Sequence, residues 1–233
     1  MEYQGTELEL FAGAIRWKTY FSRQMMPFIQ GRVLDVGAGI GSNISFLFNE
    51  KVAEWVALEP DPKLAASIAE GVASGTLPSR CRVITGTTDD LRADERFDTI
   101  IYADVLEHID DDRAEVVKAA SRLSPGGHLV ILAPAHQYLF SPFDEAVGHF
   151  RRYDSRMMRE LSPSDCSLVS VRLLDSAGLF LSLGNRLVMR AAAPTPAQID
   201  LWDRLFVPIS RITDRLVAYR FGKSVLAVWR KQT

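Results

Sequence analysis

The fold of this chain is decided by one stretch, Arg32-Val33-Leu34-Asp35-Val36-Gly37-Ala38-Gly39-Ile40-Gly41-Ser42. Its apolar run predicts a buried strand, its glycines predict a tight turn, and a helix is expected from Ser42 or Asn43. Glycines at alternate positions let the backbone come close to a ligand, because no Cβ stands in the way. The free N–H groups at the start of the helix would suit a polar or anionic ligand.

The glycine spacing separates two classes of cofactor. A dinucleotide fold uses Gly-x-Gly-x-x-Gly/Ala, whereas here the third glycine is Gly41 and the last place of that motif holds Ser42. Asp35 would be a poor neighbour for a pyrophosphate, but it could meet a cationic or amine-bearing ligand. An NAD-dependent oxidoreductase is therefore the less favoured alternative. A tight strand–helix turn without a ligand stays open at this point.

Composition sets further bounds. The length of 233 residues suits one sizeable α/β domain, and 47% apolar with 24% charged residues is ordinary for a globular protein. A net charge of −2 provides no basic field, so nucleic acid is not expected as a partner. The two cysteines form no Cys-x-x-Cys motif, which favours a reducing compartment. With no leader pattern and no membrane-spanning apolar run, we expect a cytoplasmic protein.

Acidic side chains follow the predicted strands. Glu59 ends the strand 54–59, roughly twenty residues beyond the glycine turn, where a carboxylate can accept hydrogen bonds from both hydroxyls of a ribose. The strand 97–102 leads into Ala103 and Asp104 at the edge where ligands sit in open α/β sheets. The acid cluster at 110–112 is explained by the start of a helix, so no metal is predicted.

Five blocks, in order and spacing, resemble the motifs of class I S-adenosylmethionine-dependent methyltransferases: the glycine turn, Glu59, the loop 87–91, the segment 104–108 and the turn 125–127. The resemblance covers residues 30–135. It implies an α/β, Rossmann-like sheet of seven mostly parallel strands with helices on both faces. It also implies S-adenosyl-L-methionine as cofactor and S-adenosyl-L-homocysteine as product. The cofactor contacts expected are Asp35, Gly37, Ala38, Gly39, Gly41, Glu59, Pro60, Thr87, Thr88, Asp89, Ala103 and Asp104.

Two aromatic residues ahead of the first strand, Trp17 and Tyr20, are expected either over the mouth of the cofactor site or simply packed between helix and sheet. The two interpretations are about equally favoured. Both residues fall in a segment, 1–30, that is predicted to hold one or two helices.

The segment Gly148-His149-Phe150-Arg151-Arg152-Tyr153 resembles a Gly-His-Tyr-Arg-Arg-Tyr block of the bacterial type 11/12 small-molecule methyltransferases, with Phe150 in place of the tyrosine. His149 can act as a general base near neutral pH, and His108 is the second candidate. The expected substrate contacts are His136, Tyr138, Arg151, Arg152 and Tyr153. In the alternative interpretation, the arginines pair with Asp144, Glu145 or Asp154, and the histidine satisfies a loop carbonyl.

The connection between the last two predicted strands, 167–174 and 223–230, is unusually long at about fifty residues. We therefore divide a single domain (1–233) into N-terminal helices (1–30), a cofactor-binding core (31–175), a helical cap insertion (176–222) and a final strand (223–233). Apolar residues from Ile199 to Ile212 recur every three or four positions, which predicts an amphipathic helix. This cap is expected to pack on the core or to wall the substrate pocket. Peripheral membrane contact and a homodimer interface through residues 196–220 are the alternatives, and interspersed acids argue against a pure membrane surface.

The predicted reaction is an in-line transfer of the sulfonium methyl group to an oxygen or nitrogen of a small molecule, such as a sugar, a lipid-linked acceptor or a secondary metabolite. Residues 103–106 lack the Asn/Asp-Pro-Pro-Tyr/Phe motif that the resemblance associates with amino groups of nucleic acids. A non-catalytic or repurposed S-adenosylmethionine-binding protein is the main alternative.

Overall fold

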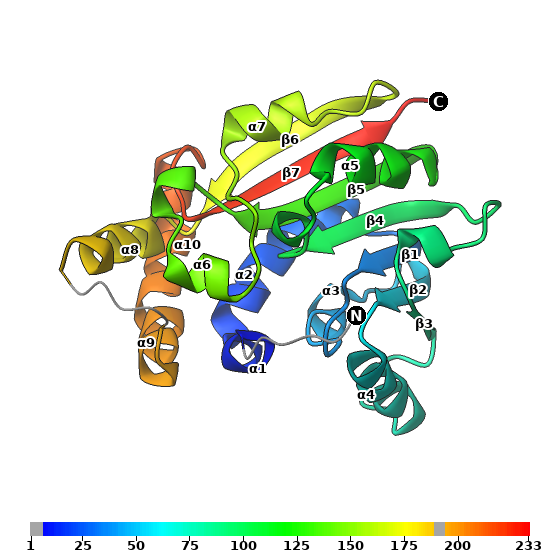
Figure 1. Cartoon of the computed structure of the whole chain (residues 1–233), viewed down its shortest axis with the longest axis horizontal. Helices are drawn as coiled ribbons and strands as arrows, with labels where there is room; N and C mark the ends of the chain where they lie inside the picture. The colour runs from blue at the N-terminus through cyan, green and yellow to red at the C-terminus, as the bar shows by residue number, and fades with distance from the viewer. Residues whose placement is uncertain (1–6, 189–193) are drawn as a thin grey trace.

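The computed structural model describes residues 7–188 and 194–233. Its centre is a seven-stranded sheet in the order β3-β2-β1-β4-β5-β7-β6 (Figure 1). Neighbouring strands are parallel except at β7, which runs antiparallel to both β5 and β6. The predicted fold is confirmed. The strands are β1 Gly31–Val36, β2 Val52–Glu59, β3 Cys81–Thr85, β4 Phe97–Ala103, β5 Leu123–Pro134, β6 Cys166–Leu174 and β7 Ser224–Lys231.

Strand β1 lies in the middle of the parallel part of the sheet. Leu34 stands opposite Val56 of β2 and Ile100 of β4, and all three side chains are fully buried. Such continuous apolar runs are typical of strands covered on both faces. The carboxyl ends of β1, β2, β4 and β5 therefore meet at one edge of the sheet, which is the edge where ligands bind in folds of this kind.

Helices cover both faces of the sheet. In Figure 1, α5 and α7 lie on one face, and α2 and α4 lie on the other. Each face has its own apolar core: Val116 and Met158 belong to one, and Trp17 and Ile68 to the other. The helices up to β6 are α1 Glu7–Ala12, α2 Ile15–Met25, α3 Ile44–Leu47, α4 Pro62–Ala73, α5 Asp112–Ser121, α6 Pro142–Ala146 and α7 Ser155–Glu160, with 3₁₀ turns η1 Met26–Phe28, η2 Thr88–Asp90, η3 Leu106–His108 and η4 Gln137–Leu139.

The helix after the glycine turn is short. It begins close to the predicted start at Ser42 or Asn43, but α3 covers only Ile44–Leu47. The side chain of Asn49 explains the early end, because its amide donates to the carbonyls of Leu47 and Ile29 while its oxygen accepts from the N–H of Lys51. An Asn side chain that bonds to nearby backbone groups favours a turn over a continued helix.

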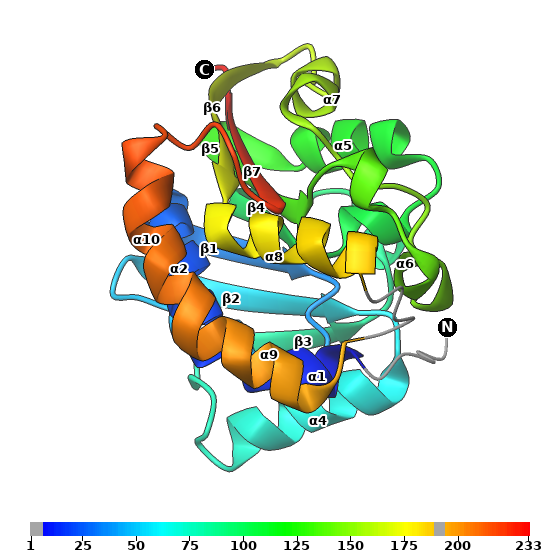
Figure 2. The same cartoon turned by 90° about the vertical axis from the view of Figure 1, so that its left-hand side faces the viewer.

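The connection from β6 to β7 forms the predicted helical cap, within which residues 189–193 lie outside the described residues. It contains α8 Ser176–Val188, α9 Pro196–Leu201, the π-helix η5 Trp202–Phe206 and α10 Val207–Leu216. Figure 2 shows α8, α9 and α10 in front of the sheet, beside α1 and α2. Among the described residues, no helix combines the length and the apolar character needed to cross a bilayer.

Candidate functional site

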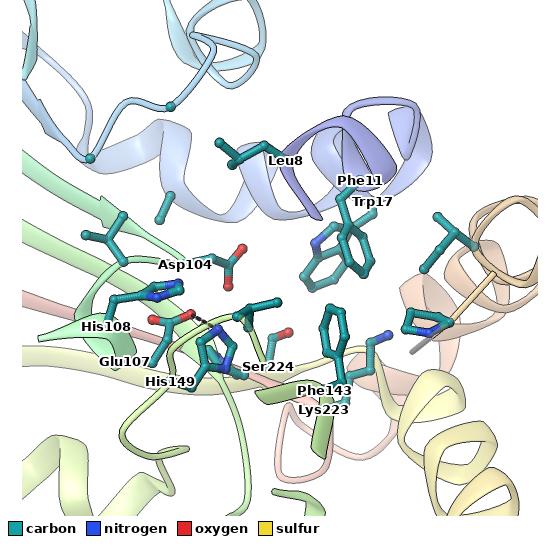
Figure 3. A pocket seen from close by; sticks show the side chains of 18 of the residues that line it. Leu8, Phe11, Trp17, Asp104, Glu107, His108, Phe143, His149, Lys223 and Ser224 are labelled. Carbon is teal, nitrogen blue, oxygen red and sulfur yellow. Dashed lines mark ion pairs between the residues drawn. The ribbon is translucent and has the colours of Figure 1, made fainter. Parts of the chain in front are cut away.

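A cavity of about 1080 Å³ opens at the carboxyl edge of the sheet (Figure 3). Ligand pockets usually enclose about 300–1,000 Å³, so this one has room for a cofactor and an acceptor together. One end is formed by the glycine turn and the strand end of β2, and the other by loops after β4 and β5. The predicted site residues that line it are Trp17, Gly37, Ala38, Gly39, Glu59, Pro60, Ala103, Asp104, His108, His149 and Arg152.

The glycine turn has the geometry that the sequence predicts. Gly37, Gly39 and Gly41 all have positive φ values, of 64°, 58° and 73°. A Cβ on Gly37 would stand 2.7 Å from a methyl carbon of Val105, so no larger residue fits there without a shift. Gly41 does not line the cavity, because its Cα faces Ile68 and Ile44 beneath the turn. Its role is to shape the backbone.

Glu59 connects the ends of β1 and β2. One carboxylate oxygen accepts a hydrogen bond from the N–H of Gly39 at 2.7 Å, and the other accepts from the N–H of Asp61 at 2.9 Å. Burial raises the pKa of Glu59, while these two hydrogen bonds act in the opposite direction. The carboxylate thus holds the glycine turn in place, and it still faces the cavity with unused lone pairs.

Asp104 lies between the two ends of the cavity in a left-handed backbone conformation, with φ of 57°. Burial raises the pKa of its carboxyl group to about 6, against the positive charges of His149, Lys223 and Lys18. Lys18 also lines the cavity and donates a hydrogen bond to Ser42 Oγ, and burial lowers its pKa to about 8. Sequence reasoning missed Lys18, because a lysine in an amphipathic helix normally faces water.

The far end of the cavity holds a connected set of polar side chains. His149 Nδ1 lies 2.8 Å from Asp144 Oδ1, and Asp144 also accepts from Arg152 Nε at 2.7 Å and Nη2 at 2.9 Å. Asp144 is fully buried, yet the hydrogen bonds from His149 and Arg152 hold its pKa well below the usual range. Because an ionised carboxylate only accepts, Nδ1 of His149 carries the hydrogen and the lone pair of Nε2 is free in the neutral ring.

His108 stands beside this pair, with its ring centre 4.6 Å from that of His149. Burial, and then the charge of His149, lower the pKa of His108 to about 4, so it is neutral near pH 7. Glu107 lies beside the two rings (Figure 3) and is 1% exposed. Within the described part of the chain, its buried Oε2 has no hydrogen-bond partner. Sequence reasoning missed Glu107, although it directly precedes a predicted site histidine at a strand end.

Several predicted cofactor residues lie outside the cavity lining. Asp35 is buried within β1, and burial raises the pKa of its carboxyl group to about 7. Tyr20 does not line the cavity; it packs beneath the cap and donates its hydroxyl to Asp214. Trp17 does line the cavity and packs against Trp202 with tilted rings, 5.7 Å between ring centres.

The loop after β3 is also turned away from the cavity. The N–H of Thr87 donates to the carboxylate of Asp90, and Thr88 Oγ1 donates to the buried Glu115. Asp89 is exposed and pairs with Lys118 at 2.6 Å. Next to this loop, the cavity wall consists of Glu59, Pro60 and Leu64.

Four of the five predicted substrate residues do not line the cavity. His136 Nε2 binds the carbonyl of Gly222 and its ring stacks on the half-exposed Tyr138. Arg151 pairs with Asp112 at 2.9 Å, and Tyr153 donates its hydroxyl to the same carboxylate. Arg152 lines the cavity but is already paired with Asp144. The pairing alternative is therefore correct for Arg152, whereas Arg151 uses an acid that was not considered.

The comparisons with known proteins agree with this arrangement. A family model described as a methyltransferase domain matches residues 10–165. One curated relative, the ubiquinone biosynthesis O-methyltransferase of Xanthomonas euvesicatoria pv. vesicatoria (strain 85-10), is 33% identical over 135 residues. That match takes in 56% of this chain and 47% of the relative, so the chain spans about half the length of the curated relative it matches.

Solved structures share the fold at low sequence identity. Coclaurine N-methyltransferase, bound to N-methylheliamine and S-adenosylhomocysteine, superposes with a TM-score of 0.64 at 15% identity, covering 94% of this chain and 72% of that one. The [4+2]-cyclase SpnF superposes with a TM-score of 0.62 at 16% identity, covering 94% and 81%. At such identities the likeness establishes the fold alone, and a methyltransferase and a cyclase that share this fold illustrate that it hosts different reactions.

Proposed function

The chain belongs to the S-adenosylmethionine-dependent methyltransferases, and we propose that it methylates an oxygen or nitrogen of a small molecule held at the polar end of the cavity. The observation that carries this proposal is the continuity of the cavity. It joins the glycine turn and Glu59 to the polar side chains of His149, His108 and Glu107, with Asp104 between them.

The cofactor end offers a partner for each polar part of S-adenosylmethionine. Glu59 can accept from the ribose hydroxyls with its unused lone pairs. The ammonium of Lys18 suits the carboxylate of the methionine portion, and the carboxylate of Asp104 suits its amino group or the positive sulfur. The backbone of Gly37 to Gly39 approaches closely because no Cβ intervenes. Van der Waals contact from Pro60 and Leu64 suits the adenine.

The main task of the protein in methyl transfer is to position the acceptor atom against the methyl carbon. The acceptor atom attacks the methyl carbon in line, the carbon–sulfur bond breaks, and its electron pair stays on sulfur. Alignment and exclusion of water supply much of the acceleration, because the donor is already activated by its positive sulfur. A hydroxyl acceptor must also lose its proton. The lone pair of His149 Nε2 can take that proton directly, as the sequence predicts, or can bind a cation that acidifies the hydroxyl.

Calorimetric titration with S-adenosylhomocysteine, with NADH as control, tests the cofactor site. We expect binding of the first ligand alone. Formation of S-adenosylhomocysteine is then followed during incubation with S-adenosylmethionine and hydroxylated or amine-bearing glycans, lipids and small metabolites. Cofactor binding without turnover of any acceptor would favour the alternative of a repurposed binding protein, and binding of NADH would overturn the proposal.

We further propose that the outer face of the cap rests on an anionic lipid surface. Apolar side chains recur on α9, η5 and α10 at steps of three or four residues, and each is roughly half exposed or more: Leu201 49%, Leu205 54%, Ile209 48%, Ile212 65% and Leu216 79%. A helix of this kind lies in the membrane interface with its apolar face down.

The charges beside this apolar face support an anionic partner. Arg204, Arg211, Arg215 and Arg220 lie on the same segment. Of its acids, Asp203 and Asp214 are buried against the core and only Asp200 is exposed, paired with Arg204 at 2.7 Å. Each basic residue near an anionic leaflet contributes about 1 kcal/mol. Because Gln198 and Ile199 of α9 also line the cavity, an acceptor dissolved in the lipid would enter beside this helix.

Sedimentation with vesicles tests this surface. We expect binding to phosphatidylglycerol-containing vesicles, little binding to pure phosphatidylcholine, and loss of binding in Ile212→Glu. The matched control is Val117→Glu, which changes a 55% exposed valine on α5, on the opposite face of the sheet. Failure to bind either vesicle, or a concentration-dependent dimer that Ile212→Glu dissociates, would overturn the membrane proposal.

A further inference from the structure

Three side chains at the acceptor end of the cavity place potential metal ligands together. One ligand atom each from Glu107, His108 and His149 lies within 4.8 Å of the other two (Figure 3). The residues come from the turn after β4 and from the loop after β5, so the fold itself brings them together. Ligand atoms on one ion lie roughly 3–3.5 Å apart, so a side-chain movement of about 1 Å would complete a site.

Glu107 is the observation that points to a cation. Its side chain is 1% exposed, and no group among residues 7–188 and 194–233 forms a hydrogen bond with Oε2. Its Oε1 lies 4.0 Å from His149 Nε2, which is too long for a hydrogen bond. A buried carboxylate without a partner is costly, so most such groups in native proteins are hydrogen-bonded, paired or bound to a metal.

Both imidazoles are prepared to act as ligands. His149 is held through Nδ1 by Asp144, which is itself fixed by Arg152 and by Ser141. A carboxylate on the far nitrogen of a histidine orients the ring and strengthens its other nitrogen as a ligand, as at many metal centres. The ring of His108 lies beside that of His149, with 4.6 Å between the ring centres.

We infer that Glu107, His108 and His149 bind one divalent transition-metal ion whose open coordination positions face the cavity. Two imidazoles and one carboxylate suit zinc, manganese or iron(II) better than magnesium or calcium, which prefer oxygen ligands. The inference rests on the proposed methyl transfer and assigns to His149 the role of ligand. The nearby carboxylate of Asp104 adds negative charge to the site.

The ion would activate a hydroxyl acceptor. Coordination to a divalent cation lowers the pKa of an oxygen-bound proton, which then leaves to solvent water through the cavity mouth. The resulting oxyanion attacks the methyl carbon, the oxygen–carbon bond forms, and the carbon–sulfur bond breaks. The products are the methyl ether or ester and neutral S-adenosylhomocysteine, so no oxidant or reductant is needed.

The test measures metal binding without reference to turnover. The full chain is stripped with a chelator, dialysed against Mn²⁺ or Zn²⁺, and assayed by electron paramagnetic resonance for manganese and by elemental analysis for zinc. We expect one equivalent bound, with affinity at least tenfold lower in Glu107→Gln. Asp144→Asn, which alters only the outer support, should lose about 10- to 100-fold.

His128→Asn is the matched control, because this histidine lies on β5 opposite Thr99 of β4 and outside the cavity lining. It should bind metal as the unchanged chain does. Equal metal binding in Glu107→Gln, or none in the unchanged chain, would overturn the inference. Binding of S-adenosylhomocysteine should persist in every variant, which shows that the variants are folded. Loss of metal binding is thereby distinguished from failure of the proposed function, in which the cofactor itself would not bind.

Discussion

Replacement of Gly37 by alanine tests the central premise that the glycine turn holds the cofactor. Gly37 has φ of +64°, and the added Cβ would stand 2.7 and 2.9 Å from the two methyl carbons of Val105. An alanine in the left-handed conformation costs about 1–2 kcal/mol. Carbon atoms in contact normally lie about 3.5–4.0 Å apart, so something must move by about 1 Å, and overpacking of this kind costs about 1–3 kcal/mol.

The resulting strain of about 2–5 kcal/mol divides between two measurable quantities. Part lowers the free energy of unfolding, and part weakens ligand binding, because a turn that relaxes away from Val105 must be forced back when the cofactor binds. We expect S-adenosylhomocysteine to bind at least about tenfold more weakly, which corresponds to 1.4 kcal/mol. Calorimetric titration measures the affinity, and urea unfolding measures the stability.

Two further variants separate the sources of the strain. Gly75→Ala is a matched control, because Gly75 has φ of +78° but nothing within 4 Å of the added Cβ. It should lose about 1–2 kcal/mol of stability and no affinity. Val105→Ala in the Gly37→Ala background removes the two clashing methyl groups and should recover the steric part. If Gly37→Ala bound S-adenosylhomocysteine within twofold of the unchanged chain, the turn would not be the cofactor site.

Three other outcomes follow from buried carboxylates. Glu59→Gln places an amide NH₂ group against the N–H of either Gly39 or Asp61, so the affinity for S-adenosylhomocysteine should fall by about tenfold or more. Unchanged affinity in calorimetric titration would count against the role of Glu59 in binding the ribose. Asp214→Ala leaves the Tyr20 hydroxyl and two backbone N–H groups unpaired, and urea unfolding should report a loss of about 3 kcal/mol. Asp35 has its pKa raised from 3.8 to about 7, so the folded state binds its proton more tightly and stability falls as pH rises from about 4 to 7. Over this pH range the carboxyl group of Asp35 changes the free energy of unfolding by up to about 4 kcal/mol, and Asp35→Asn should remove this change. If the pH dependence of stability were the same in Asp35→Asn, the carboxyl group would titrate normally in the folded state.

The sequence was sufficient to place residues that stand at strand ends. In a parallel sheet the carboxyl ends of neighbouring strands share one edge, so Gly37, Glu59 and Asp104 had to converge whatever their side chains do in detail. His149 was placed by the resemblance of its segment, and it does line the cavity. These positions depend on topology, which the hydrophobic pattern and the order of the motifs already determine.

Polar loop residues could not be placed in the same way. Arg151 and His136 have side chains that could contact a substrate, but each binds a protein group that is distant in sequence. Arg151 forms an ion pair with Asp112, and His136 forms a hydrogen bond with the carbonyl of Gly222. The choice between solvent, protein and ligand depends on which acceptor lies within about 3 Å, and a sequence pattern does not contain that distance. Glu107 was missed for the same reason.

The acids of the cap show how tertiary contacts can reverse an argument made from composition. Asp203 and Asp214 lie among apolar and basic residues along the chain, which argues against a membrane surface if all of them face outward. Both instead point into the protein: Asp203 accepts from the N–H groups of Arg16 and Trp17, and Asp214 accepts from Tyr20 and from the start of α8. The same contacts that fasten the cap to α2 therefore remove two negative charges from its outer face. What remains outside is apolar and mostly basic, and the one exposed acid of the segment, Asp200, is paired with Arg204. Gln198 and Ile199 of the same segment line the cavity. Under the proposed function, this segment would therefore both wall the site and face the lipid surface from which an acceptor arrives.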